Sequence, residues 1–348
     1  MTRIFRIDKN NFMEAIRKAA LIIKEGGTVA FPTETVYGLG ADALDPDAVA
    51  RIFKAKGRPA DNPLIVHIAS QEQIPDIAKS IPEHARKMME MFWPGPLTLI
   101  LRRKEIVPDI TTGGLDTVAV RMPSNPIAIE LIRQAGTPIA APSANVSGRP
   151  SPTTAEHVIS DLKGRIDAVI DGGHVEIGVE STVVDVTRDI PVILRPGEIS
   201  AKQLSKCTGE VMIGYEDRTL GEDEIARSPG MKYTHYSPQT KVILVEGKII
   251  EEVEKKITDL VEEHHIRGMR AGLLISKESA EKISADETFL LGERDRPSQA
   301  AQKLFKGLRE LDSRGVDVII VDGLIKREGV GAAVLNRIRK AADEQINV

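Results

Sequence analysis

The chain of 348 residues has little cysteine, few aromatic side chains and no long hydrophobic run. Its single cysteine, Cys207, excludes an intramolecular disulfide and any zinc cluster built from several cysteines. Aromatic residues make up only 3% of the sequence, so we expect aliphatic cores and no aromatic platform for stacking bases. No apolar run approaches the ~20 residues that a membrane-spanning helix needs, and the first residues lack a signal-peptide core. We therefore expect a cytoplasmic protein without membrane contact.

The sequence also lacks an excess of one charge. It carries 47 Lys and Arg against 51 Asp and Glu, which argues against a general nucleic-acid-binding protein. Residues 1–206 hold 25 basic and 25 acidic residues, and residues 241–348 hold 19 and 20. Residues 207–240 hold three basic and six acidic residues, several Gly and Pro, and no sustained period. We predict a linker or long functional loop there, between two domains at 1–206 and 241–348.

Hydrophobic periodicity predicts a mixed α/β fold for residues 1–206. Helices are expected near 11–23, 46–55, 82–92, 125–135 and 153–161, the third with a capping box formed by Ser80 and Glu83. Short apolar runs predict strands at 28–31, 64–68, 97–101, 118–120, 168–170, 182–186 and 192–194. Because strands and helices alternate irregularly, we expect a twisted mixed sheet with flanking helices.

Residues 241–348 have a more regular pattern. Four strands, each followed by a helix, predict a small parallel, doubly wound sheet of Rossmann-like architecture. The turn after its first strand reads VEGKIIEE and lacks the GxGxxG fingerprint of dinucleotide-binding domains. The chain also has no P-loop motif and no HExxH or paired histidine spacing, so no metal ligands are predicted.

Five loops are rich in small hydroxyl, glycine, proline and basic residues: 32–40, 54–68, 141–153, 178–185 and 194–200. Taken singly, each also fits an ordinary turn or a solvated basic loop, and His67 also fits a satisfied core histidine. Lys56 and Arg58 around Gly57 suit a polyphosphate, because an ammonium and a guanidinium there can both reach it. Taken together, the loops predict one site for an anionic ligand that works by positioning and charge neutralisation. The sequence offers no Ser or Cys nucleophile with an evident histidine partner.

The motifs in these loops resemble those of the YrdC/Sua5 family. PTETVYGLG, KxKGRP followed by NPLIVHI, FWPGPLTLIL, VAVRMPxN, APSANVSGRPSPT, GVESTVVD and ILRPG occur in this order. The segments SPGMKYTHYSP and GVGAAVLNRIRKAA are similar to the long, two-domain Sua5 form, so the resemblance covers nearly the whole chain. It implies a YrdC-like catalytic domain at 1–206, an active-site lid at 207–240 and a Sua5 C-terminal domain at 241–348.

The resemblance implies a threonylcarbamoyl-AMP synthase. This family condenses L-threonine, bicarbonate and ATP into threonylcarbamoyl-adenylate and releases pyrophosphate. The product supports the t6A modification of adenosine 37 in tRNAs that read ANN codons. The resemblance further implies a Mg²⁺ ion held mainly by the ATP phosphates and water. Transferase proteins of the t6A pathway are the expected downstream partners, and weak binding of tRNA is a further expectation.

The family's site residues map onto this sequence by motif. The threonine site would be formed by Thr35, His67, Arg121, Ala141 and Ser181. The ATP site would be formed by Lys56, Arg58, Asn62, Thr117, Ser143, Asn145, Ser151, Arg195 and Tyr236. Lys56 and Arg58 would be catalytic by neutralising the phosphates, and Tyr236 would close over the nucleotide. In the linker, Gly230 would be a hinge, and Tyr233 and His235 would help to cover the site.

Two further expectations concern what is missing from the site and the cores. No residue is an evident general base. Tyr37 falls in the first loop and the other three tyrosines fall in the linker, so no tyrosine is expected in the sheet cores.

Three other functions fit the sequence less well. An RNA-binding module that uses a concave basic face is disfavoured by the zero net charge of residues 1–206. A dinucleotide-dependent enzyme is disfavoured by the missing glycine fingerprint. A hydrogenase-maturation carbamoyltransferase, which contains a similar domain, also carries cysteine-rich zinc fingers that a single cysteine excludes here.

Overall fold

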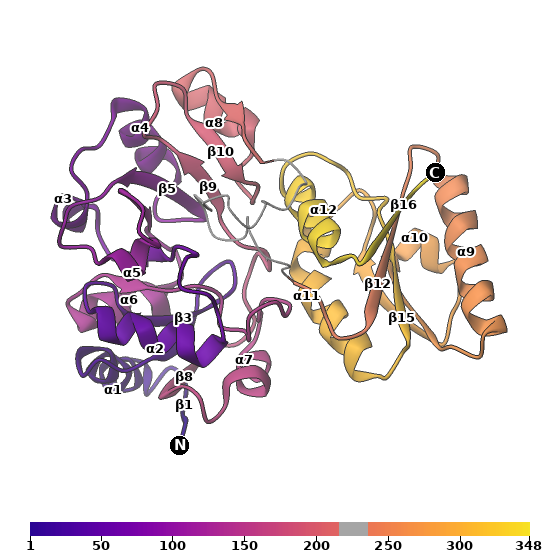
Figure 1. Cartoon of the computed structure of the whole chain (residues 1–348), viewed down its shortest axis with the longest axis horizontal. Helices are drawn as coiled ribbons and strands as arrows, with labels where there is room; N and C mark the ends of the chain where they lie inside the picture. The colour runs from indigo at the N-terminus through magenta and orange to yellow at the C-terminus, as the bar shows by residue number, and fades with distance from the viewer. Residues whose placement is uncertain (216–235) are drawn as a thin grey trace. The chain divides into compact units, whose positions relative to one another are not determined.

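The computed structural model describes residues 1–215 and 236–348, which fall into two compact units (Figure 1). The first unit comprises Met1–Ser147, Ser151–Glu176 and Glu180–Tyr233. The second comprises Thr234–Val348 together with two short pieces from earlier in the chain, Gly148–Pro150 and Ile177–Val179. The second unit is therefore assembled from three separate pieces of chain.

The first unit is built on a mixed sheet, as predicted, and this sheet has 11 strands. Its strand order is β1-β8-β2-β3-β7-β4-β6-β5-β9-β10-β11. The strands are β1 (Arg3–Arg6), β2 (Val29–Pro32), β3 (Tyr37–Asp42), β4 (Ile65–His67), β5 (Leu97–Arg102), β6 (Thr117–Arg121), β7 (Ile139–Ala140), β8 (Ala168–Asp171), β9 (Thr182–Asp185), β10 (Val192–Arg195) and β11 (Met212–Ile213). Parallel and antiparallel pairs both occur: β4 runs parallel to β6, and β5 runs antiparallel to β6.

Helices flank this sheet. They are α1 (Phe12–Lys24), α2 (Pro46–Lys56), the 3₁₀ turn η1 (Gln71–Gln73), α3 (Ile74–Ile77), α4 (Glu83–Phe92), α5 (Asp109–Thr112), α6 (Pro126–Ala135), α7 (Ala155–Leu162) and α8 (Ala201–Thr208). α1 and α6 pack with Phe31 and Ile139 into one aliphatic core, and a larger core lies around Leu39, Val66 and Leu99. The long helices expected from periodicity are thus confirmed within a few residues at each end.

Strand register sets the face on which functional side chains lie. His67 pairs with Arg121, and Arg121 pairs with Thr98 on the next strand. Residues that pair across a ladder point to the same side of a sheet, so these three side chains share one face of β4, β6 and β5. A small buried cluster lies beside them and includes Ile65, Ile100, Ala119, Val183, Val192 and Leu194. We call this face, formed by β4, β6, β5 and β9, the polar face.

Two sequence expectations were wrong. Tyr37 lies in a strand and is fully buried, with its hydroxyl donating to the carbonyl oxygen of Gly173 at 2.6 Å. The glycines after it suggested a loop, but Gly40 is needed inside the sheet because a Cβ there would lie 2.6 Å from Phe31 and from Ile139. The capping box is also absent: α4 starts at Glu83 behind Pro82, so Glu83 is the first helical residue rather than the third.

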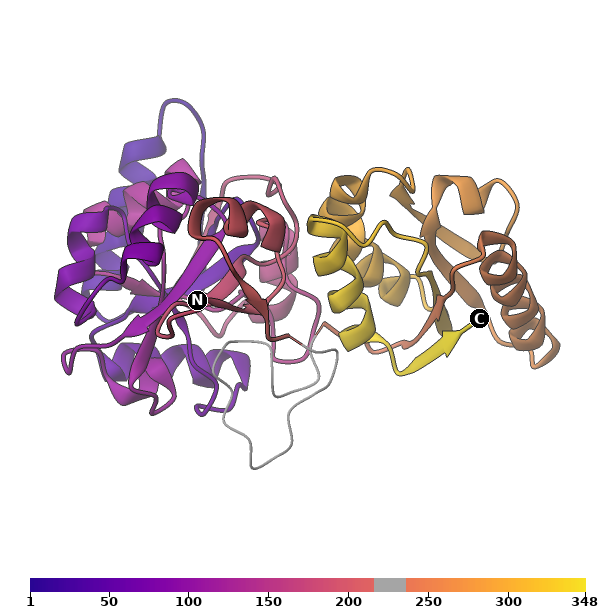
Figure 2. The ribbon, with the colours of Figure 1, turned by 90° about the horizontal axis from the view of Figure 1, so that it is seen from above.

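The second unit contains a five-stranded, all-parallel sheet of order β14-β13-β15-β12-β16. The strands are β12 (Lys241–Glu246), β13 (Ala271–Ser276), β14 (Glu287–Gly292), β15 (Val318–Asp322) and β16 (Glu344–Asn347). The helices are α9 (Ile250–Ile266), α10 (Lys277–Ala280), α11 (Pro297–Ser313) and α12 (Val330–Ala341). Figure 2 shows α9 on one side of the sheet and α11 and α12 on the other, which confirms the predicted doubly wound architecture. Within residues 1–215 and 236–348, no helix is long and apolar enough to cross a membrane.

Candidate active site

Arg121 lies at the centre of the polar face and is almost fully buried. Its Nη2 donates to Oε1 of Glu34 at 2.6 Å, and its Nη1 donates to Oγ1 of Thr35 at 2.9 Å. The other carboxylate oxygen of Glu34 accepts the backbone N–H of Ser124 at 3.1 Å. The structure therefore brings Thr35 and Arg121 together, and it adds Glu34, which the sequence analysis did not single out. Glu34 lies next to Thr35 in PTET, but its burial could not be read from that motif.

His67 lies beside Arg121 on the polar face and is also buried. Its Nδ1 is 3.2 Å from the carbonyl oxygen of Ile65, and its ring meets Phe31 edge-on with 6.4 Å between the centroids. Burial and, next, the charge of Arg121 lower the pKa of His67 to about 3. The imidazole is therefore neutral at physiological pH and can take part in hydrogen bonding without carrying a charge.

Ser181 is held between a threonine and an arginine. Arg195, at the end of β10, donates from Nε to the carbonyl oxygen of Ser181 and from Nη2 to its Oγ, both at 3.0 Å. Oγ1 of Thr98 lies 2.8 Å from the same Oγ. All three side chains are buried. The predicted residues Ser181 and Arg195 thus lie together, next to a threonine that the sequence analysis did not single out.

Lys56 connects helix α2 to the loop at 141–153. α2 begins after Asp45, whose carboxylate accepts the N–H groups of Asp47 and Ala48, and it ends at Gly57 in the left-handed region. The buried ammonium of Lys56 donates to the carbonyl oxygens of Ser143 and Asn145, each at 2.5 Å. Lys56 therefore fixes the loop that carries two of the predicted nucleotide-binding residues, besides any contact it makes with a phosphate.

Within that loop, local hydrogen bonds orient the predicted side chains. Oγ of Ser143 donates to Oδ1 of Asn145 at 2.6 Å, and Oγ of Ser151 donates to Oε1 of Glu180 at 2.6 Å. Ala141, a residue of the predicted threonine site, donates its N–H to the carbonyl oxygen of Ile65 at 2.9 Å. This backbone hydrogen bond holds the loop against β4. It places the backbone of Ala141 beside the polar face, where the predicted contribution of Ala141 to the threonine site would be made.

The side-chain amide of Asn62 makes no hydrogen bond to the described residues. Its side chain is fully buried, yet neither Oδ1 nor Nδ2 has a hydrogen-bond partner among the residues that the structure describes. The nearby guanidinium of Arg58 donates at 3.4 Å to the backbone oxygens of Asn62 and Pro63, not to the amide. A buried amide without a partner costs about 1–3 kcal/mol. Such a group is expected where a ligand completes the hydrogen bonding.

The predicted residues fall at two ends of the polar face. Asn62 precedes β4 and Thr117 begins β6, whereas His67 and Arg121 end the same two parallel strands. Thr117, Ala119 and Arg121 alternate along β6, so Thr117 shares the face of Arg121 but lies four residues away from it. The arrangement provides two adjacent polar regions with apolar Ile65 and Ala119 between them.

The linker residues can be only partly placed. Gly230, Tyr233 and His235 lie outside the described residues. Tyr236 belongs to the second unit, where its ring stacks on Phe305 with 5.2 Å between centroids and lies 5.7 Å from the guanidinium carbon of Arg337. Its backbone has a φ of +70°, which side-chain-bearing residues rarely adopt. Its proposed closure over a nucleotide stays a prediction.

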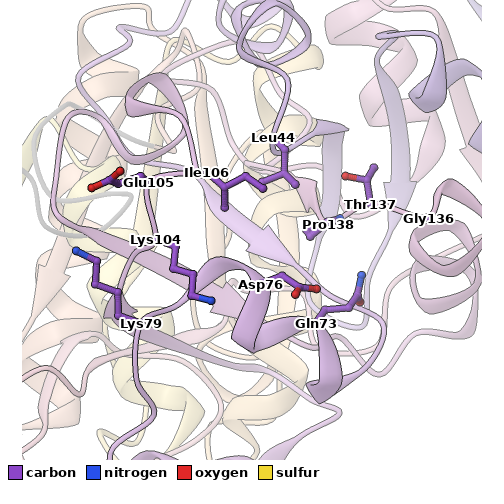
Figure 3. Close-up of a pocket in the computed structure, with 10 residues that line it drawn as sticks. All are labelled: Leu44, Gln73, Asp76, Lys79, Lys104, Glu105, Ile106, Gly136, Thr137 and Pro138. Carbon is purple, nitrogen blue, oxygen red and sulfur yellow. The ribbon is translucent and has the colours of Figure 1, made fainter.

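One cavity of the first unit has a volume of about 760 Å³ and contains none of the predicted residues (Figure 3). It is lined by residues of η1, of α3, of the loops that follow β3, α3 and β5, and of the loop that precedes β7: Leu44, Gln73, Asp76, Lys79, Lys104, Glu105, Ile106, Gly136, Thr137 and Pro138. It has no part in the function proposed below.

Comparisons with known proteins agree with the geometry. A family model described as "Telomere recombination" (Sua5_yciO_yrdC) matches residues 21–197. A second, "Threonylcarbamoyl-AMP synthase, C-terminal domain" (Sua5_C), matches residues 199–343. The threonylcarbamoyl-AMP synthase of Pyrococcus abyssi is 51% identical over 99% of each chain, and that of Bacillus subtilis is 47% identical over 95% of this chain and 94% of its own. A crystal structure of P. abyssi Sua5 complexed with L-threonine superposes with a TM-score of 0.93 at 50% identity, covering 100% of this chain and 99% of that one.

These matches and the two folded units define a two-domain protein of the long Sua5 type, with a YrdC-like first unit. The chain belongs to the Sua5/YrdC family of threonylcarbamoyl-AMP synthases. Its activity is the synthesis of threonylcarbamoyl-adenylate in tRNA modification.

Proposed function

We propose that the polar face binds L-threonine at the end formed by Thr35, His67, Arg121 and Ser181, and ATP at the end formed by Asn62 and Thr117. One observation carries the proposal for threonine: two buried hydroxyl residues, Thr35 and Ser181, are each hydrogen-bonded by a buried arginine. Guanidinium groups recognise carboxylates, and hydroxyl groups suit the polar side chain of threonine. The P. abyssi relative has been crystallised in complex with L-threonine, which supports L-threonine as the ligand.

The ATP site would extend from Asn62 and Thr117 to the loop held by Lys56. The unsatisfied amide of Asn62 supports this assignment, because a nucleotide base or ribose can supply the missing hydrogen bonds. Ser143, Asn145 and Ser151 would orient the nucleotide. Lys56, Arg58 and Arg195 would surround the phosphates and neutralise charge that develops in the transition state.

The reaction would proceed through a carbamate. The amine of threonine attacks the carbon of bicarbonate and water leaves, which gives N-carboxy-threonine. A carbamate oxygen then attacks the α-phosphorus of ATP while pyrophosphate leaves. The residues hold the two reactants in line and exclude water, since a carbamate and a mixed anhydride are both prone to hydrolysis.

A Mg²⁺ ion would accompany the ATP. Among residues 1–215 and 236–348, no group of three His, Cys, Asp or Glu side chains is arranged to hold a metal ion. The side chains therefore do not fit a resident metal centre, and the ion would take its ligands from the phosphates and water.

The product is an activated, hydrolysable adenylate, so a transferase that acts on tRNA must consume it. We infer t6A-pathway transferase proteins as downstream partners, with weak tRNA binding by this chain and a cytoplasmic location as accompanying predictions.

The proposal is tested by pyrophosphate release from the purified full chain, with threonine and bicarbonate omitted in turn. Release should require both, and mass spectrometry should detect one carbon from labelled bicarbonate in the adenylate. Ser181→Ala should raise the KM for threonine, while Ser205→Ala, outside the site, should leave it unchanged. Pyrophosphate release without threonine and bicarbonate would refute the proposal.

A further inference from the structure

We propose that Glu198 receives the ammonium group of L-threonine and accepts its proton before the amine is carboxylated. The inference rests on the proposed binding of threonine beside Arg121 and Ser181. It supplies the general base that the sequence did not reveal.

The backbone around Glu198 is fixed against Ser181. Oγ1 of Thr182 donates to the carbonyl oxygen of Ile199 at 2.8 Å and accepts the N–H of Ile199 at 3.1 Å. On the other side of Glu198, a Cβ on Gly197 would lie 2.2 Å from the backbone nitrogen of Thr182, so only glycine permits this approach. The backbone of Glu198 is thus fixed by its two neighbours, Gly197 and Ile199. Both contact Thr182, the first residue of β9, which directly follows Ser181.

The charges around Glu198 favour a cation. No hydrogen bond or ion pair to Glu198 is present among the described residues. Partial burial and then the charges of Glu34 and Glu176 raise the pKa of Glu198. Glu34 already has an ion-pair partner in Arg121, whereas Glu198 has none among the described residues, so Glu198 can pair with a cationic group of the substrate.

Other groups on the polar face are poor candidates for the same role. His67 is buried, and its pKa of about 3 makes it a weak base. Both carboxylate oxygens of Glu34 already accept hydrogen bonds, from Arg121 and from Ser124. Lys56 donates to two carbonyl oxygens. Glu198 is exposed to solvent, and its carboxylate makes no such hydrogen bond to the described residues.

The chemistry requires such an acceptor. At neutral pH the amine of threonine is an ammonium ion, which has no lone pair for attack on carbon. Transfer of one proton to Glu198 yields a neutral amine and a carboxylic acid. The amine then attacks the carbon of bicarbonate, a C–N bond forms, and water leaves with one proton of the amine, which gives the carbamate anion.

The test uses the full chain with Glu198→Gln, at saturating ATP and bicarbonate and with threonine varied across pH. At neutral pH, kcat/KM for threonine should fall by about 10²-fold or more, the usual contribution of a general base. The loss should shrink about tenfold for each unit of rising pH, because solution then supplies the free amine. Near wild-type activity, or a pH profile parallel to that of the wild type, would overturn the proposal.

Two further variants separate catalysis from structure. Glu176→Gln removes a negative charge that raises the pKa of Glu198. This variant should therefore lower the pKa of Glu198 and move the acidic limb of the pH–rate profile to lower pH. Glu198→Asp should retain part of the activity without alkaline rescue. An unmoved acidic limb in Glu176→Gln overturns the proposal even if Glu198→Gln fails to fold. The proposed function is tested separately, by the requirement of the wild type for threonine and bicarbonate. If that requirement holds and the Glu198 and Glu176 variants behave like the wild type, only the role of Glu198 is overturned.

Discussion

Glu34 and Arg121 form an ion pair with 2.6 Å between Oε1 and Nη2, and 2% and 4% of their respective side-chain surfaces are exposed. Two charges are rarely buried this completely, because each loses its hydration. Here the pair is completed by Ser124, Thr35 and Gly95, which satisfy further donors and acceptors. Arg121 is therefore held in a fixed direction before any substrate arrives.

This pair predicts the effect of Glu34→Ala. Removing one partner leaves a buried guanidinium uncompensated, which destabilises proteins by about 3–5 kcal/mol. We expect a loss of that size in the free energy of unfolding, measured by urea denaturation at neutral pH, and a raised KM for threonine. The control is Glu105→Ala, whose exposed carboxylate makes no ion pair within the described residues and should change stability by less than about 0.5 kcal/mol. Equal stability of the two variants would contradict the role of the pair.

Asn62→Leu should separate binding from stability. Leucine has a similar shape and no polar atoms, so it removes the cost of an unsatisfied buried amide. We expect unchanged or increased thermal stability of the free protein, together with ATP affinity weakened about tenfold or more in calorimetry. A marked loss of stability would show that the amide has a partner within the chain.

The neutral state of His67 predicts how stability depends on pH. Its pKa is about 3 in the folded protein and about 6.5 when unfolded, so between these values the unfolded chain binds more protons. This contribution to stability is therefore present above pH 6.5 and is lost as the pH falls toward 3. In His67→Asn the free energy of unfolding should fall less steeply below pH 6.5, by about 1.4 kcal/mol per pH unit. Urea denaturation at pH 4.5, 5.5 and 7.5 tests this, and parallel curves for the two proteins would contradict it.

Lys56→Ala should abolish most of the activity. The ammonium fixes the carbonyl oxygens of Ser143 and Asn145 and is proposed to reach the phosphates, so a loss of about 10²–10³ in rate is expected. Lys54 lies on an exposed side of the same helix, and Lys54→Ala is the matched control. Comparable rates of adenylate formation in the two variants would remove Lys56 from the site.

The sequence predicted elements wherever local periodicity decides the structure. The helices at 46–56 and 126–135 and the strands β12, β13, β14 and β15 of the second unit follow directly from their apolar spacing. β3 was missed because its glycines are typical of a loop. In the structure Gly40 is required by its close approach to Phe31 and Ile139, residues that the sequence of β3 itself does not reveal. β16, at the edge of its sheet, was missed because its residues are mostly polar and exposed.

The same distinction applies to the candidate site. Its basic and hydroxyl residues could be found in loop motifs, but the partners that orient them come from distant positions. Glu34 is 87 residues from Arg121, and Thr98 is 83 residues from Ser181. Such pairings depend on strand order in the 11-stranded sheet, which no local pattern encodes. The absence of a partner for Asn62 is likewise visible only once every neighbour is in place.

The discontinuous make-up of the second unit has a consequence for biosynthesis. Its piece Gly148–Pro150 interrupts the loop between Ser143 and Ser151, and its backbone is bound by residues made much later: Ser237 donates to Gly148 at 2.8 Å, and Arg309 donates to Pro150. A ribosome translates from the N-terminus, so both short pieces of the second unit, Gly148–Pro150 and Ile177–Val179, leave it well before residues 234–348. These pieces can therefore join the second unit only after most of its chain has been made.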